Sequence, residues 1–190
     1  MNRTVVWTPV RWPGSEHTHV REDAGSVSVD GMVIVADNRP VRLHYRLTCD
    51  QAWTTKRLEV ALYGGPSTTL VRADDGTWSD EAGPRPDLAG CVDVDITATP
   101  FTNTLPIRRL SLEPGSSADL RMAYVLVGTR LEVTPAEQRY THLDSDAAGS
   151  LYRYESRNFR ADLTVDADGL VTDYPGRWRQ VQVVEERAAH

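Results

Sequence analysis

The chain has 190 residues, of which 40% are hydrophobic and 25% are charged, and its formal net charge is -6. This length and composition predict one folded domain over residues 1–190 and exclude a disordered chain. The negative charge balance disfavours a general nucleic-acid binder or a protein of anionic membrane surfaces, because both partners are recognised by positive fields.

The N-terminal residues carry no targeting signal. Residues 1–7 lack the apolar stretch of a signal peptide, and no run in the chain approaches the length that crosses a bilayer. We therefore expect a cytoplasmic protein without integral membrane insertion.

Cys49 and Cys91 lack metal-ligand spacing, and His17 and His19 lack a partner for a metal site. We expect no metal and buried, reduced thiols, although the spacing leaves a disulfide between the two cysteines open.

Alternation of apolar and polar residues predicts β-strands along most of the chain. Taken in order, the pattern covers residues 27–35, 41–49, 56–63, 117–127, 131–142 and 159–165. Turn-forming residues stand between these runs, at 74–76, 113–115, 166–169 and 174–176, so most neighbouring strands should pair antiparallel. Residues 79–90 and 144–150 are predicted to be surface loops.

No repeat and no comparable helical stretch interrupts the strands. The predicted fold is therefore mainly β with little helix, built on a single large curved antiparallel sheet that is rolled into a complete or half-open barrel.

The most unusual stretch is residues 90–110, which read Gly-Cys-Val-Asp-Val-Asp-Ile-Thr-Ala-Thr-Pro-Phe-Thr-Asn-Thr-Leu-Pro-Ile-Arg-Arg-Leu. This segment resembles the signature of the bacterial family named "putative glycolipid-binding", formerly a domain of unknown function. The likeness extends to residues 138–141, 152–154, 159–165, 165–171 and 174–176. The resemblance implies a spiral β-roll like the half-barrels of bacterial lipoprotein carriers, and a role in holding a glycolipid or another amphiphile. Those carriers act outside the cytoplasmic membrane, whereas this chain is expected in the cytosol.

Two aspartates within this segment allow two interpretations. If residues 92–96 form a strand, Asp93 and Asp95 share one face with Cα atoms about 7 Å apart. That spacing is compatible with the two carboxyl groups of an inverting glycosidase. The alternative, which we favour, is structural: the pair forms ion pairs with Arg46, Arg108 or Arg109, which orient the following loop.

The residues that follow are predicted to form a rigid loop at the rim of a binding site. Pro100 and Pro106 restrict the backbone, and the side chains of Thr99, Thr102 and Asn103 can bond to the main chain or to a head group. We place Arg108 and Arg109 on a strand, where adjacent side chains point to opposite sides, so that only one of them faces a ligand. A purely structural loop is an equal alternative.

The leading functional hypothesis is a non-catalytic protein that holds a glycolipid or similar amphiphile in the concave face of the sheet, without a cofactor. The five tryptophans and the tyrosines at 140, 152, 154 and 174 are expected to serve the core more often than a pocket. The predicted ligand-binding residues are Thr99, Thr102, Asn103, Arg108, Arg109, Tyr140, Tyr174 and Trp178. The alternatives are a hydrolase of a glycosylated or acylated small molecule that uses Asp93 and Asp95, and an interaction module that binds a protein through an exposed strand edge.

Overall fold

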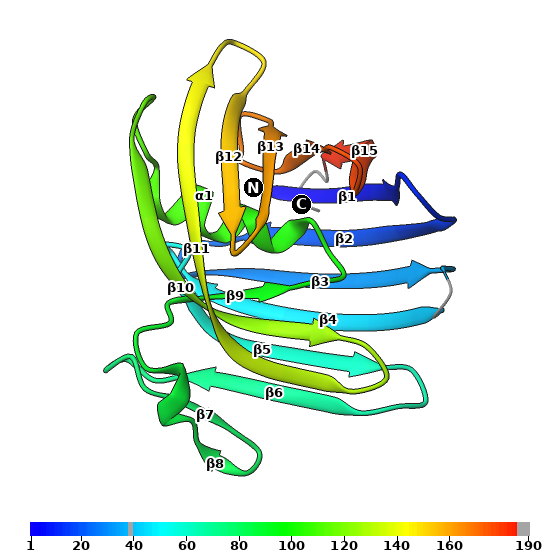
Figure 1. The fold of residues 1–190 in the computed structure, drawn as a ribbon, viewed down its shortest axis with the longest axis vertical. Coiled ribbons are helices and arrows are strands. Elements are labelled where there is room, and N and C mark those ends of the chain that lie inside the picture. Colours follow the sequence, from blue (N-terminus) through cyan, green and yellow to red (C-terminus); the bar gives the residue numbers. More distant parts are fainter. Residues whose placement is uncertain (38–39, 186–190) are drawn as a thin grey trace.

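One curved sheet of 15 strands forms the framework of the computed structural model, which describes residues 1–37 and 40–185 (Figure 1). The first half of the sheet contains β1 (Asn2–Pro9), β2 (Gly14–Glu22), β3 (Ser26–Val35), β4 (Val41–Asp50), β5 (Thr55–Leu62), β6 (Ser67–Arg72), β7 (Trp78–Asp80) and β8 (Gly83–Pro84). The second half contains β9 (Asp93–Ile96), β10 (Ser117–Val127), β11 (Leu131–Ser145), β12 (Ser150–Ser156), β13 (Phe159–Val165), β14 (Val171–Tyr174) and β15 (Trp178–Glu185).

The strand order is β8-β7-β6-β5-β4-β3-β2-β1-β15-β14-β13-β12-β11-β10-β9. The first and last strands of the chain therefore pair in the middle of the sheet, and the sheet does not close into a barrel. Every neighbouring pair is antiparallel except β9 and β10, which run parallel. The prediction of a mainly β fold with one large curved sheet is confirmed.

The period-two pattern correctly predicts which side chains are buried. Along β3 every second residue from Val27 to Val35 is buried, and β4 alternates in the same way. Gly31 is the one gap in the apolar row of β3. It lies opposite Tyr45, and a Cβ atom at Gly31 would come within 2.2 Å of the Tyr45 ring. The glycine thus leaves room for this aromatic side chain inside the roll.

The segment after β9 corrects two predictions. Residues expected to form a rigid loop and a strand instead form a 3₁₀ helix, η2 (Phe101–Asn103), followed by the α-helix α1 (Thr104–Leu110). Pro106 is tolerated because it lies in the first turn, where a missing N–H costs no helical hydrogen bond. The helix ends at Ser111, which has a left-handed φ of 44°. Arg108 and Arg109 are therefore helical residues and do not lie on a strand.

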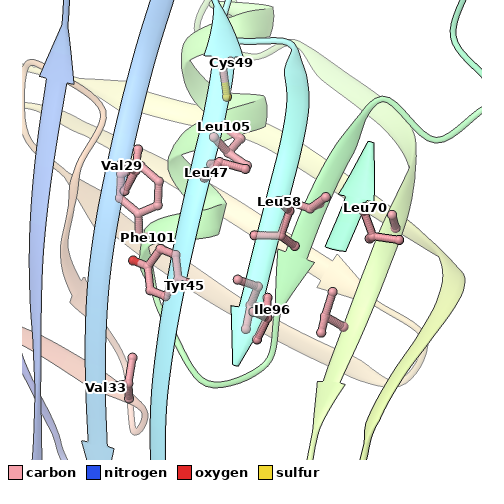
Figure 2. Packing of buried hydrophobic residues seen from close by; sticks show 14 of the residues in the cluster. Val29, Val33, Tyr45, Leu47, Cys49, Leu58, Leu70, Ile96, Phe101 and Leu105 are labelled. Atoms are coloured by element: carbon pink, nitrogen blue, oxygen red, sulfur yellow. The ribbon is translucent and has the colours of Figure 1, made fainter. Parts of the chain in front are cut away.

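This helical segment fills the inside of the roll. Figure 2 shows Ile96, Phe101 and Leu105 facing the inward side chains of β3, β4 and β5. The Phe101 ring stacks on the Tyr45 ring with centroids 6.4 Å apart. All of these side chains belong to one buried apolar cluster, so the segment joins the two halves of the sheet through hydrophobic contact.

The other loops and the cysteines follow the expectations with small differences. Residues 79–90, which were predicted to be a loop, contain the end of the short strand β7, the strand β8 and a second 3₁₀ helix, η1 (Pro86–Leu88). The turn at residues 166–169 is a tight hairpin in which Asp166 accepts the backbone N–H groups of Asp168 and Leu170. Cys49 and Cys91 are both buried and free. No helix in the described part of the chain has the length and apolar character that spanning a membrane requires.

Candidate ligand-binding site

A cavity of ≈ 530 Å³ opens beside the helical segment, against the second half of the sheet. We call it the aromatic cavity. Strands β9 to β15 provide most of its wall, and the rest comes from the segment from β9 to η2 and from the turns before β13 and β15. The lining residues are Asp95, Ile96, Thr97, Thr99, Asn103, Tyr124, Ala136, Tyr154, Ser156, Arg157, Asn158, Phe159, Tyr174, Arg177 and Trp178.

Aromatic rings dominate one side of this cavity. Tyr154, Phe159 and Tyr174 contact one another with ring centroids 6.0 to 6.4 Å apart. The guanidinium group of Arg177 lies 5.0 Å from the centre of the Phe159 ring, in cation–π geometry. Such rings offer flat apolar faces together with polar hydroxyl groups, a combination suited to ligands that are apolar on one side and polar on the other.

Asp95 supplies the carboxyl group of the cavity. Its side chain accepts a hydrogen bond from Thr102 Oγ1 at 2.9 Å and one from Gln138 Nε2 at 2.6 Å. Burial raises the pKa of Asp95, and these neutral donors only partly oppose that effect. Burial is the main cause of the raised pKa of the Tyr124 and Tyr174 hydroxyls, and the negative charge of Asp95 raises it further.

Asp93 has a different environment and does not line the aromatic cavity. It is fully buried, and Arg109 of α1 binds both of its carboxylate oxygens, with N···O distances of 3.1, 3.1 and 2.6 Å. Burial raises the pKa of Asp93, while the Arg109 charge opposes the rise. The ion-pair interpretation thus describes Asp93 and Arg109. Because the two aspartates do not face a common cavity, the geometry gives the hydrolase alternative no support.

The hydroxyl and amide groups of the signature segment hold this segment in shape. Thr102 Oγ1 accepts the Ile96 N–H at 3.2 Å while it donates to Asp95, and Asn103 Nδ2 donates to the carbonyl of Pro100. Tyr140 donates its hydroxyl to Asn103 Oδ1 at 2.9 Å from the opposite side. Thr102 and Tyr140 therefore lie behind the cavity wall, whereas Asn103 is part of it.

Glu16 forms a polar cluster that the sequence analysis missed. Its Oε1 accepts hydrogen bonds from the hydroxyls of Thr18 (2.8 Å), Tyr45 (2.7 Å) and Thr99 (2.6 Å). Glu16 is fully buried, and burial raises its pKa to about 7 against the opposing effect of these three donors. Because Thr99 also lines the aromatic cavity, the cluster links β2 and β4 to the cavity wall. The only sequence signal was the position of Glu16 on the same face as Thr18 and Val20.

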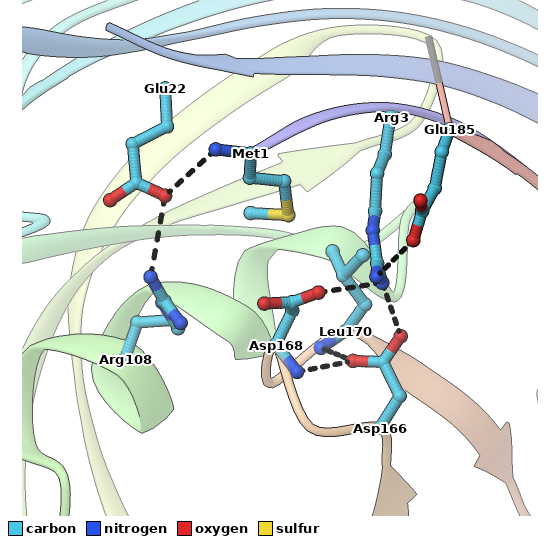
Figure 3. Close-up of polar contacts among 8 residues, drawn as sticks. All are labelled: Met1, Arg3, Glu22, Arg108, Asp166, Asp168, Leu170 and Glu185. Atoms are coloured by element: carbon cyan, nitrogen blue, oxygen red, sulfur yellow. Dashed lines mark hydrogen bonds and ion pairs between the residues drawn. The ribbon is translucent and has the colours of Figure 1, made fainter. Parts of the chain in front are cut away.

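A second cavity of ≈ 490 Å³ lies near the other end of α1, lined in part by Arg108, Arg109, Trp53 and Tyr152. Arg108 lies 4.9 Å from the centre of the Trp53 ring and donates a 3.4 Å hydrogen bond to Glu22. Figure 3 shows Glu22 between Arg108 and the amino group of Met1, which is 3.6 Å from the carboxylate. Arg108 thus already has a carboxylate and an aromatic partner.

The predicted ligand-binding residues therefore divide into three groups. Thr99, Asn103, Tyr174 and Trp178 line the aromatic cavity, Arg108 and Arg109 line the second cavity, and Thr102 and Tyr140 support the wall from behind. Tyr124, Phe159, Arg157 and Arg177 were not predicted for this site. Tyr124 lies on β10, Arg157 and Phe159 lie at the turn before β13, and Arg177 lies in the turn before β15, so no single local pattern joins them. Among residues 1–37 and 40–185, no three His, Cys, Asp or Glu side chains gather in a group that could hold a metal ion.

Comparison with known proteins places this architecture. Residues 4–180 match the family described as "Putative glycolipid-binding". The chain belongs to this family. A crystal structure of a DUF1089 family protein from Pseudomonas aeruginosa is similar to it, with 35% sequence identity and a TM-score of 0.73. The match covers 87% of this chain and 92% of that one. Comparison with curated proteins gives no match. In this member of the putative glycolipid-binding family, the signature residues 90–110 form β9, η2 and α1, the part that fills the roll and borders the aromatic cavity.

Proposed function

We propose that the protein binds an amphiphile, such as a glycolipid, by enclosing its polar head group in the aromatic cavity. The observation that carries the proposal is the composition of this cavity, which combines aromatic rings with the polar side chains of Asp95, Thr99 and Asn103. Its volume lies within the range of about 300–1,000 Å³ that is usual for small-molecule sites. The family name supports the same class of ligand.

The packing of the roll supports the head group, rather than the acyl chain, as the occupant of the cavity. Ile96, Phe101 and Leu105 are almost completely buried and occupy the space next to β3, β4 and β5 that an acyl chain would need. Polar groups such as Asp95 would lose hydrogen-bonding water to a methylene chain without compensation. A head group with hydroxyl or charged groups replaces that water, and its apolar tail then extends from the opening of the cavity.

The proposal is tested with a substitution that fills the cavity. Ala136 of β11 is buried and lines the aromatic cavity, so Ala136→Phe should occupy part of its volume. Ala52→Phe, at an exposed position of the second cavity, adds the same side chain elsewhere and is the matched control. Each protein is incubated with a polar lipid extract, re-isolated by gel filtration, and analysed by solvent extraction and mass spectrometry.

We expect the unsubstituted protein and the Ala52→Phe variant to retain the same amphiphile, and the Ala136→Phe variant to lose most of it. Circular dichroism and urea unfolding establish that both variants are folded. If the unsubstituted protein retains no amphiphile, or if the folded Ala136→Phe variant retains as much, the proposed function is wrong.

A further inference from the structure

In the part of the chain that the structure describes, Asp95 differs from the neighbouring Asp93 in having no cationic partner. Asp93 is held by Arg109, whereas Asp95 accepts hydrogen bonds from the uncharged side chains of Thr102 and Gln138 and also has the uncharged Tyr154 hydroxyl beside it. Within residues 1–37 and 40–185, no arginine, lysine or histidine forms an ion pair with Asp95, although the residue is only 8% exposed. A carboxylate with so little access to water is costly unless a positive charge compensates it. The aromatic cavity is the open side from which such a charge can approach.

The rings next to Asp95 suit a cation. Tyr124, Tyr154, Tyr174 and Trp178 line the cavity together with Asp95. The faces of such rings attract ammonium and guanidinium groups, and aromatic sites of this kind bind quaternary ammonium ligands. The wall already holds one cation in this way, because Arg177 lies over Phe159. The carboxyl group and the rings together would bind a positively charged nitrogen.

The opening of the cavity has the opposite charge. Arg157 and Arg177 are exposed lining residues, and neither has a carboxylate partner in the described part of the chain. Arg157 has a φ of 51° in the turn between β12 and β13, where glycine or asparagine is favoured. Both arginines act to lower the pKa of the Tyr124 hydroxyl, which Asp95 acts to raise. The Tyr124 hydroxyl therefore lies within reach of both charges.

We propose that the aromatic cavity selects a zwitterionic head group, whose cationic nitrogen lies against Asp95 and the rings and whose anionic group lies at Arg157 and Arg177. This inference rests on the proposed function, because both use the same cavity. A simple cation would be repelled by the two arginines, and a simple anion by Asp95. A ligand that carries both charges can pair with Asp95 and with the two arginines, whereas a neutral sugar offers no charge to either.

Isothermal titration calorimetry with small probes tests this selectivity. Phosphocholine is the zwitterionic probe, choline and inorganic phosphate carry its separate charges, and octyl glucoside is a neutral glycolipid analogue. We expect phosphocholine to bind at least tenfold more tightly than any of the other three. Because a bound cation favours the ionised carboxylate, we also expect binding to release protons, measured as a heat that depends on the buffer.

Substitutions then assign each charge. Asp95→Asn should weaken phosphocholine binding at least tenfold and abolish the proton release, while Asp119→Asn, at an exposed carboxylate outside the cavity, should change neither. Arg157→Asn suits the left-handed turn and remains informative if the Asp95 variant fails to fold. It should weaken phosphocholine binding but not choline binding.

Two results would overturn the inference. In the first, octyl glucoside binds, Ala136→Phe abolishes this binding, and phosphocholine does not bind. The proposed function would then hold, and the selectivity for a zwitterion would be wrong. The other is phosphocholine binding that is unaffected in the folded Asp95→Asn and Arg157→Asn variants. If no probe binds and no amphiphile is retained from the lipid extract, the proposed function falls together with the inference.

Discussion

Replacing Arg109 by methionine should destabilise the protein by removing the cation that, in the described part of the chain, forms the ion pair with Asp93. The carboxylate is fully buried and makes three N···O contacts of 2.6 to 3.1 Å with this arginine. Breaking a buried ion pair from one side costs about 3–5 kcal/mol, because a charge remains without compensation. Arg109 is 16% exposed, so some water can reach the site, and we expect about 3 kcal/mol. For a domain of this size, that loss lowers the melting temperature by roughly 6–12 °C.

The loss of stability caused by Arg109→Met should depend on pH in a defined direction. Burial already raises the pKa of Asp93, and removal of Arg109 should raise it further. A carboxyl group whose pKa is higher in the folded state than in the unfolded state takes up a proton on folding, so stability increases as the pH falls. The deficit of Arg109→Met should therefore be largest at neutral pH and shrink under acidic conditions. The double variant Asp93→Asn/Arg109→Met, which has no charge at this pair of positions, should regain most of the lost stability.

Urea unfolding followed by circular dichroism measures these free energies. Arg139→Met is the matched control, because Arg139 also contacts both oxygens of a carboxylate, that of Asp119, but the two side chains are 48% and 73% exposed. A surface pair of this kind contributes about 0–1 kcal/mol. The reasoning is refuted if Arg109→Met costs no more than Arg139→Met, or if the double variant is as unstable as the single one.

Three further predictions concern buried groups. Folding raises the pKa of Glu16 from 4.5 to about 7, which corresponds to about 3 kcal/mol, so the contribution of Glu16 to stability should fall as the pH rises from about 4.5 to above 7. Glu16→Gln should abolish this part of the pH dependence, measured by urea unfolding at pH 5 and pH 8. Equal pH dependence in the two proteins would contradict this prediction. Gly31→Ala places a methyl group 2.2 Å from the Tyr45 ring and should cost about 1–3 kcal/mol of unfolding free energy; an unchanged urea midpoint would show that the ring moves freely. Burial raises the pKa of the Cys49 and Cys91 thiols, so both should react with a thiol reagent much more slowly in native protein than in urea; equal rates would argue against the packing described for them.

Long-range contacts explain why the candidate site was only partly predicted. Thr99, Asn103, Tyr174 and Trp178 were chosen from the sequence and do line one cavity, although they lie far apart in the chain. Glu16 was not chosen, because a single carboxylate in an alternating strand usually faces solvent. Its burial follows from hydroxyl donors on β4 and on the segment after β9, which no local pattern brings together.

The helical segment shows the same limit at the level of secondary structure. α1 has only seven residues, fewer than the 11 to 18 over which helical periodicity is recognised, and its Pro106, like the preceding Pro100, resembled a loop signal. Its helical form becomes favourable when Leu105 and Ile107 are buried inside the roll and Arg109 binds Asp93.

The sequence by itself determined the strands, their inward faces, most of the turns and the family, since period-two alternation, turn residues and the 90–110 signature are all local properties. The tertiary structure decided what covers each inward face: the burial of Glu16 and Asp93, the helix inside the roll and the aromatic cavity at Asp95. Those features depend on contacts between residues distant in the chain, and their free energies arise only when the sheet curves around the helical segment.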